Sequence, residues 1–124
     1  MLAAAPLESD IQIEIVAWLR LVAPQLLVVS NKNEGSKSFR GNAHAVKMGR
    51  VVGISDLTIF DDRPAGLVAH FMEVKRPKGK LRPAQEEFRM KCLTRNWPWC
   101  VVHSVDEARV ALVHWKIETR EVST

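Results

Sequence analysis

Apolar side chains recur every three or four residues near the start of the chain. The set comprises Leu7, Ile11, Ile15, Trp18, Leu19 and Val22. This spacing places them on one face of a helix, so the sequence predicts an amphipathic helix over residues 7–22. Pro6 suits the first turn of that helix, and Pro24 predicts its end. The short apolar run at 26–29 then predicts a strand.

Two apolar runs in the middle of the chain predict a β-hairpin. The runs cover residues 54–60 and 67–75, and a polar turn rich in Asp, Pro and Gly separates them. The second run is apolar over 66–72 except for His70, which is typical of a strand that is covered on both faces. We interpret His70 as a residue of that strand rather than as a ligand.

The remaining segments complete an alternation of helices and strands. The sequence predicts a polar loop over 31–41, a short helix over 42–48, a helix over 83–94, a strand over 99–103 and a final helix that opens with a capping box at Ser104–Glu107. The inward side chains of the last two helices are Ala84, Phe88 and Cys92, and Ala108, Leu112 and Trp115. This order predicts an α/β fold with a mixed central β-sheet flanked by helices, in a single domain spanning residues 1–124.

The end of the predicted hairpin carries the most informative residues. Alternate residues of a strand point to the same face, so Glu73 and Lys75 project together. A hairpin centred between Pro64 and Ala65 sets Asp56 directly opposite Glu73, with Cβ atoms roughly 5 Å apart. That spacing suits one hydrated Mg²⁺ or Mn²⁺ between the two carboxylates. A register shifted by one residue would instead put them on opposite faces.

The cost of burying charge indicates a function for the charged residues at the end of the hairpin. Charged groups at the end of a covered strand are costly unless they are paired, bind a metal or face a cleft. Two opposed acids without a cation would also repel each other. We therefore interpret Asp56, Glu73 and Lys75 as a divalent-metal phosphodiesterase site. The alternative is that Glu73 and Lys75 form a solvated surface pair.

The basic residues are concentrated in two blocks on either side of the acids. The first block contains Lys32, Lys37, Arg40, Lys47 and Arg50, and the second contains Lys75, Arg76, Lys78, Lys80 and Arg82. The net charge is +4 at pH 7, and acids outnumber bases outside these blocks. Such a distribution is expected of a surface that contacts the phosphate backbone of nucleic acid. Two solvated loops are the alternative interpretation.

Composition argues against several other classes of protein. The chain has 47% hydrophobic and 26% charged residues, as ordinary globular proteins do. No apolar stretch approaches the roughly 20 residues of a membrane span, and residues 1–6 do not resemble a signal peptide. Cys92 and Cys100 are expected to be free thiols in a reducing cytoplasm rather than a disulfide. They show no zinc-ligand spacing with the histidines.

Four short motifs lie along the chain. They are Glu8-Ser9-Asp10-Ile11-Gln12, Gly53-Ile54-Ser55-Asp56, Glu73-Val74-Lys75-Arg76-Pro77 and Gly79-Lys80-Leu81-Arg82-Pro83-Ala84-Gln85. Together they resemble the VRR-NUC (virus-type replication-repair nuclease) domain of the PD-(D/E)xK nuclease superfamily. The resemblance extends from about Glu8 to Asp106. Ser55 stands where the superfamily pattern has proline before the aspartate.

The resemblance implies metal-dependent DNA cleavage and a role for each matching residue. Asp56 and Glu73 would ligate Mg²⁺ or Mn²⁺ together with the backbone carbonyl of Val74. Lys75 would orient or activate the attacking water and stabilise the developing charge on phosphorus. Gln85, in the helix after the hairpin, would position the substrate or the lysine.

The first helix supplies a further acid. Glu8 matches the acid that the family carries in this helix, where it would support the metal site. Glu8 and Gln12 lie one turn apart and could reach the site together. Alternatively, Ser9 and Gln12 form a capping box, which leaves Glu8 outside the helix and Glu14 as the alternative acid.

The leading hypothesis is a structure-selective DNA endonuclease that acts on branched DNA such as Holliday junctions. Stand-alone members of the family resemble Holliday junction resolvases, which implies a homodimer with two sites in a prokaryotic or phage-infected cell. Trp97, Trp99 and Trp115 are candidates for the dimer surface, although tryptophans more often lie in the core. The alternatives are a nucleic-acid-binding accessory protein without catalysis and a sequence-specific restriction enzyme. A chain this short lacks a separate DNA-reading domain, which disfavours the restriction enzyme.

Overall fold

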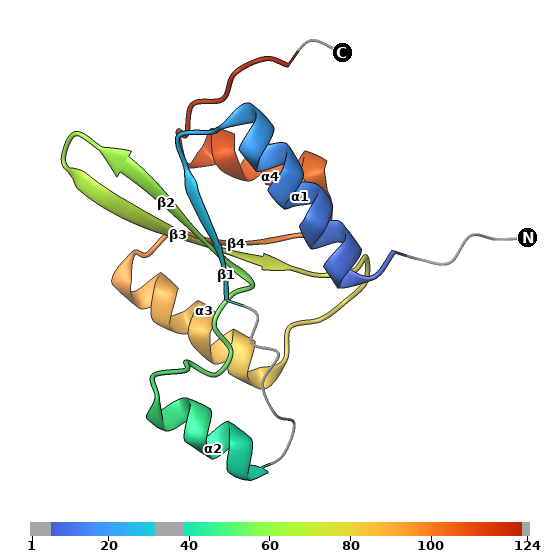
Figure 1. Ribbon diagram of the computed structural model, residues 1–124, viewed down its shortest axis with the longest axis vertical. Helices are drawn as coiled ribbons and strands as arrows, with labels where there is room; N and C mark the ends of the chain where they lie inside the picture. Colours follow the sequence, from blue (N-terminus) through green and yellow to red (C-terminus); the bar gives the residue numbers. More distant parts are fainter. Residues whose placement is uncertain (1–5, 32–38, 123–124) are drawn as a thin grey trace, which may run out of the picture.

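The structure of the protein, a computed structural model, describes residues 6–31 and 39–122 (Figure 1). Its helices are α1 (Glu8–Val22), α2 (Phe39–Lys47), α3 (Pro83–Arg95) and α4 (Val105–His114). Its strands are β1 (Leu27–Ser30), β2 (Leu57–Arg63), β3 (Gly66–Val74) and β4 (Trp99–Val102). No helix in the described ranges has the length and apolar character needed to cross a membrane.

The strands form one mixed sheet in the order β1-β2-β3-β4. β1 pairs antiparallel with β2 and β2 pairs antiparallel with β3, whereas β3 and β4 are parallel. Helices α1 and α4 pack together on one face of the sheet, and α3 lies on the other face (Figure 1). This arrangement confirms the predicted α/β fold with a mixed central sheet flanked by helices.

The β2–β3 hairpin has the predicted register. The pairing runs from Arg63 opposite Gly66 to Leu57 opposite Met72. Because a tight turn fixes the register of a hairpin, the next positions along the two strands also face each other. These positions are Asp56, directly before β2, and Glu73, the last but one residue of β3.

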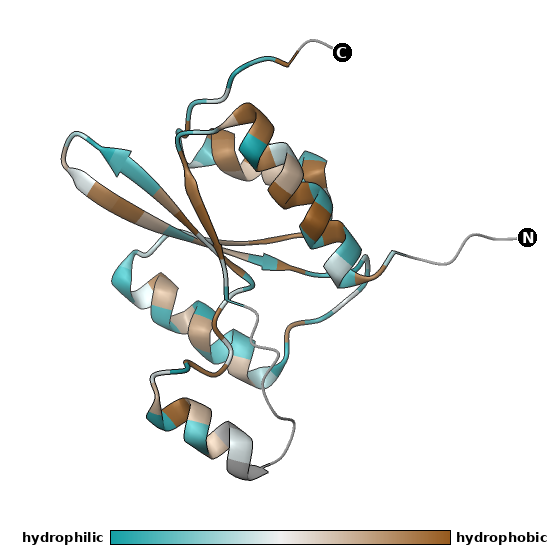
Figure 2. Ribbon diagram, viewed as in Figure 1, coloured by the Kyte–Doolittle hydropathy of each residue, from teal (hydrophilic) through white to brown (hydrophobic). Residues whose placement is uncertain are grey.

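The larger hydrophobic core lies between the sheet and the α1–α4 pair. Its fully buried side chains include Ile15, Leu19, Leu57, Ile59, Met72 and Leu112. Figure 2 shows the apolar faces of α1 and α4 in brown beside the brown stretches of the strands. The predicted inward residues of the last helix, including Trp115, belong to this core.

His70 is a core residue of β3, as the sequence predicts. It is 1% exposed, its Nδ1 lies 3.1 Å from the carbonyl oxygen of Ile59, and its ring centroid lies 4.8 Å from that of Trp115. Burial lowers the pKa of His70, so the imidazole is neutral at pH 7. Residues three apart on a strand point to opposite faces, so His70 points away from the face that carries Glu73.

The layer between the sheet and α3 is thinner and built from aromatic rings. The ring of Phe71 in β3 meets the ring of Phe88 in α3 edge-on, with centroids 5.1 Å apart. The ring centroids of Phe71 and Trp97 are 6.2 Å apart. Phe88 and Cys92 are buried and Ala84 is half-buried, so the predicted inward face of α3 is confirmed. Cys92 and Cys100 are free thiols, and burial raises the pKa of Cys100 to about 12.

Helix α1 begins one residue later than predicted and is capped differently. The Asp10 carboxylate accepts a hydrogen bond from the backbone N–H of Leu7 (3.4 Å), which makes Leu7 the residue before the helix. Pro6 therefore precedes the helix instead of occupying its first turn. The capping box at Ser9 is wrong, because Glu8 already lies in the first helical turn.

Other boundaries shift where turns replace strands. β2 begins at Leu57 rather than at residue 54, because the residues before Asp56 form a turn in which Gly53 has a φ of 81°. α2 begins at Phe39 rather than at residue 42, and the part of the predicted polar loop over 32–38 lies outside the described residues.

The start of α4 has the predicted cap. The Ser104 Oγ accepts a hydrogen bond from the backbone N–H of Glu107 (3.2 Å). The Glu107 carboxylate in turn accepts from the N–H of His103 (3.2 Å), which ends β4 at Val102.

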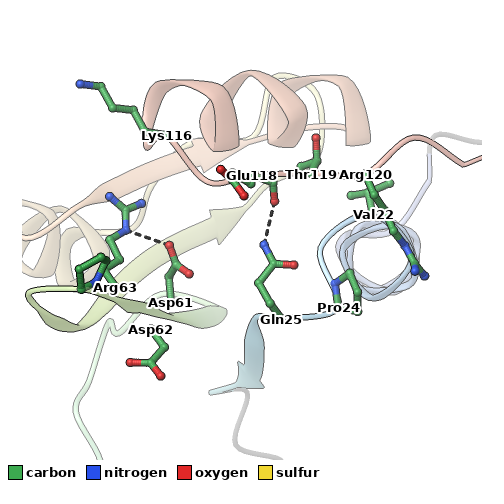
Figure 3. Close-up of a pocket in the computed structure, with 11 residues that line it drawn as sticks. Val22, Pro24, Gln25, Asp61, Asp62, Arg63, Lys116, Glu118, Thr119 and Arg120 are labelled. Atoms are coloured by element: carbon green, nitrogen blue, oxygen red, sulfur yellow. Dashed lines mark hydrogen bonds and ion pairs between the residues drawn. The ribbon is translucent and has the colours of Figure 1, made fainter.

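The segment after α4 is held against the end of α1. The backbone N–H of Arg120 donates to the carbonyl of Val22 (2.7 Å), and the Gln25 amide donates to the carbonyl of Glu118 (2.8 Å; Figure 3). Ile117 is buried in the α1–α4 core. Together with the turn of the hairpin, this segment encloses a cavity of about 640 Å³.

The turn at Gly53 gives a testable prediction. A Cβ atom at Gly53 would overlap the carbonyl of Ala84, in the first turn of α3, and its positive φ disfavours other residues. Gly49 also has a positive φ (106°), but no atom lies within 4 Å of the position where its Cβ would be. Gly49→Ala should therefore lower the free energy of unfolding only through backbone strain, by about 1–3 kcal/mol. Gly53→Ala should lower it further.

Urea denaturation of the two variants measures the difference. The excess loss in Gly53→Ala reports the close approach between the turn and α3. Equal losses in the two variants would show that this approach does not constrain the fold.

Candidate active site

Asp56 and Glu73 are brought together at the end of the hairpin. Both lie on the α3 side of the sheet, because they are opposed in register and alternate residues of β3 share a face. The Asp56 Oδ2 accepts a hydrogen bond of 2.7 Å from the backbone N–H of Val74. The Asp56 side chain thus continues the ladder of hydrogen bonds beyond the point where the backbone of β2 turns away.

Gln85 ties Glu73 to the start of α3. Its Nε2 donates to Glu73 Oε1 (2.9 Å), and its Oε1 accepts from the backbone N–H of Arg82 (2.8 Å). A backbone N–H can only donate, so this contact fixes which end of the Gln85 amide faces Glu73. Gln85 therefore both caps α3 and orients a buried carboxylate, which is 2% exposed.

Lys75 is a buried cation on the same face as Glu73. It is 3% exposed, and its backbone N–H donates to the carbonyl of Val102 in β4 (3.0 Å). Its charge lowers the pKa of Glu73. Within residues 6–31 and 39–122, no salt bridge joins Lys75 to an acid.

The carboxyl group of Glu73 has a raised pKa. Burial is the main cause that raises the pKa of Glu73 to about 8, followed by the charge of Asp56 and a hydrogen bond with its carboxyl group. The charge of Glu8, in the first turn of α1, also raises the pKa of Glu73. Glu14 is exposed and is not among the groups that shift Glu73.

The oxygen atoms of this site fit a hard divalent cation. Asp56 Oδ2 accepts from Val74 and Glu73 Oε1 accepts from Gln85, and a cation would replace the proton that links the two carboxyl groups. The N–H and C=O of one strand residue point to the same side, so the carbonyl of Val74 points toward Asp56. Mg²⁺ and Mn²⁺ prefer such oxygen ligands and usually keep several waters. Across the described residues no group of three or more His, Cys, Asp or Glu side chains could hold a metal, so Val74 and water would complete the site.

A cavity of about 350 Å³ opens beside Asp56. It is lined by Asn31, Arg50, Val51, Val52, Gly53, Ile54, Asp56, Arg82, Ala84 and Gln85. Arg50 and Arg82 come from the two basic blocks, which therefore meet at the acids. The larger cavity in Figure 3 lies near the turn of the hairpin, at the other end of β2, and contains none of the predicted site residues.

The other predicted DNA-binding residues whose side chains the structure describes do not line this cavity. Lys47 ends α2, and Arg76, Lys78 and Lys80 are exposed basic residues of the β3–α3 connection. Lys32, Lys37 and the side chain of Arg40 lie outside the described residues.

Asn31 is a site residue that the sequence prediction missed. Its backbone N–H donates to the carbonyl of Asp56 (2.8 Å), and its side-chain amide donates to the carbonyl of Ser55 (3.1 Å) and the hydroxyl of Thr58. These contacts hold the turn that carries Asp56. The available signal was a polar residue at the end of the first strand, but its meaning depends on the pairing of β1 with β2.

The raised pKa predicts a pH dependence of stability in EDTA. The unfolded chain releases the Glu73 proton near the ordinary pKa of 4.5, whereas the folded protein keeps it up to about pH 8. The folded state binds more protons in this window, so the free energy of unfolding falls as the pH rises through it. The Gln side chain in Glu73→Gln does not ionise, so this contribution to the loss of stability should disappear. The Tm of the variant should be higher than that of the wild type at pH 8 and similar to it at pH 4.5.

Thermal unfolding followed by circular dichroism between pH 4.5 and 8.5 measures this effect. Glu87→Gln, at an exposed position of α3, is the matched control and should keep the wild-type slope. Parallel curves for Glu73→Gln and the wild type would contradict the assigned proton.

Comparison with known families agrees with this geometry. The sequence matches the family profile of the VRR-NUC domain over residues 4–106. No curated protein and no solved structure was found to match the chain. The matched region contains Asp56, Glu73, Lys75 and Gln85 and the whole sheet. Because the match covers well over half of the 124 residues, the chain belongs to the VRR-NUC family of nuclease domains.

Proposed function

We propose that the protein is a divalent-metal-dependent endonuclease that hydrolyses phosphodiester bonds in DNA. Family membership supports nuclease chemistry on DNA. The observation that carries the proposal is the pairing of half-buried Asp56 with buried Glu73, and Asp56 lines a cavity that Arg50 and Arg82 also line. A bound Mg²⁺ or Mn²⁺ would neutralise charge on the scissile phosphate and lower the pKa of a coordinated water.

The residues of the site would have separate roles in the reaction. Asp56, Glu73 and the carbonyl of Val74 would hold the ion. Water attacks phosphorus in line with the leaving oxygen, and the bond between phosphorus and that oxygen breaks. Lys75, buried on the face of Glu73, is suited to orient this water and to stabilise the negative charge that builds up on the phosphoryl oxygens.

Two residues support the site without touching the substrate. Gln85 fixes the orientation of the Glu73 carboxylate, so we propose it as a positioning residue. Glu8 adds negative potential from α1, which favours a cation between the carboxylates.

We also propose that the substrate is branched DNA, such as a Holliday junction, and that a homodimer cuts it. Two sites related by a twofold axis would act on the two strands of a branch. Trp97 (43% exposed) and Leu67 (66% exposed) line an apolar hollow of about 440 Å³ and are the candidate dimer surface. Trp115 is buried in the core and is not a candidate.

Asp56→Asn tests the catalytic assignment. The asparagine oxygen can still accept the hydrogen bond from Val74, so the fold should survive while the charge that holds the cation is lost. Cleavage of labelled four-way and flap DNA in Mg²⁺ should fall by about 100-fold or more, while DNA binding in a gel-shift assay persists. Asp62→Asn, an exposed change at the far end of β2, should cleave like the wild type. Wild-type cleavage by Asp56→Asn would refute the proposal.

Metal-linked stability separates a nuclease from a non-catalytic nucleic-acid-binding protein. At about 100 times its Kd, Mn²⁺ should raise the free energy of unfolding of the wild type by about 2.7 kcal/mol. Asp56→Asn should lose most of this gain, and Asp62→Asn should retain it. An accessory protein that binds DNA only through its basic residues would show no such dependence on Mn²⁺.

A further inference from the structure

An exposed apolar ridge lies beside the candidate active site. It comprises Met48, Val51 and Val52, which are 76%, 44% and 58% exposed. Single exposed apolar side chains are common on protein surfaces, but neighbouring ones next to a polar cavity indicate a binding surface. The ridge lies outside the four motifs and has no role in the hydrolysis itself.

The backbone holds this ridge in place. The N–H of Arg50 donates to the carbonyl of Ala45 (3.0 Å) and that of Gly49 to the carbonyl of Val46 (3.0 Å), which closes the end of α2 with a glycine at positive φ. Gly53, at the other end of the ridge, lies against the first turn of α3. The ridge therefore runs from the closed end of α2 to the turn that lies against α3.

Cavities lie on both sides of the ridge. The cavity beside Asp56 has a volume of about 350 Å³, and a second one of about 360 Å³ is lined by Ala45, Met48 and Gly49. The residues that line both are Asn31, Arg50, Val51 and Ile54. The two hollows thus form one continuous surface from Met48 to the catalytic acids.

The lining of this surface matches an unstacked nucleotide. The ridge offers apolar contact for the face of a base, and Asn31 and Arg82 offer polar groups for its edge or its phosphate. Asp56 is the sole acid among the residues that line the two cavities. A surface that combines apolar side chains with the cations Arg50 and Arg82 suits nucleic acid. In such complexes the protein's cations contact phosphates and its apolar side chains enter between bases.

We propose that the cavity beside Asp56 receives an unpaired nucleotide next to the scissile phosphate, and that the apolar ridge separates it from the stacked bases. This inference rests on the proposed function and specifies its substrate preference. In a continuous duplex the base faces are stacked and closed to the ridge. At a branch point the stack is already open, so the cost of unstacking is smaller. A protein partner on this surface would instead cover Asp56 and block cleavage.

The test combines cleavage with a binding signal that does not depend on cleavage. The double variant Met48→Ser/Val52→Ser removes the ridge at exposed positions, where substitutions cost little stability. Val110→Ser/Val113→Ser, on the exposed outer face of α4, is the matched control. Cleavage of a four-way junction and of its continuous duplex is compared in Mg²⁺. In the Asp56→Asn background, 2-aminopurine at the branch point reports unstacking by a rise in fluorescence.

The ridge variant should lose about tenfold or more of its kcat/KM on the junction and much less on the duplex, while the control keeps the wild-type ratio. The fluorescence rise seen with Asp56→Asn alone should disappear when the ridge is also removed. An unchanged junction-to-duplex ratio with unchanged fluorescence in the ridge variant would overturn the inference but leave the nuclease assignment standing. A ridge-dependent fluorescence rise without any cleavage by the wild type would support the inference and overturn the nuclease assignment.

Discussion

The pairing of a buried carboxylate, Glu73, with the half-buried carboxylate of Asp56 is the constraint on which the rest of this structure depends. Desolvation and mutual repulsion both disfavour ionisation of Asp56 and Glu73 together, so the surroundings must compensate. The N–H of Val74, the amide of Gln85 and the charge of Lys75 do so from three directions. Each belongs to an element whose position follows from the fold, namely β3, the start of α3 and the strand end beside β4.

The two faces of strand β3 carry different kinds of residue: one contributes to the apolar core, and the other bears the charged groups of the site. Met72 and Val74 enter the core under α1 and α4, whereas Glu73 and Lys75 face the α3 side. The apolar core that stabilises the fold is therefore distinct from the charged groups of the site. Part of that core comes from beyond the matched region, because Leu112 and Ile117 follow residue 106. The last helix completes the hydrophobic layer behind β3.

Local patterns in the sequence predicted much of this arrangement. The turn centred between Pro64 and Ala65 sets the hairpin register, and with it the opposition of Asp56 and Glu73. The contacts that bring distant segments together were not predictable in the same way. Asn31 meets the turn before β2 only because β1 is the neighbouring strand, and Gly53 requires its lack of a Cβ only because α3 packs there. The sequence offered Ser9 as a possible cap of α1. In the structure the Asp10 carboxylate caps the helix at Leu7 instead.

Gln85 joins a peptide group that borders the basic loop to a buried carboxylate. Its amide links the N–H of Arg82 to Glu73 through two hydrogen bonds in series. A displacement of the chain at Arg82 is therefore transmitted to the orientation of an acid on the neighbouring strand. Arg82 also lines the cavity beside Asp56. A ligand that fills this cavity and shifts Arg82 would therefore also change the orientation of Glu73 through the Gln85 side chain.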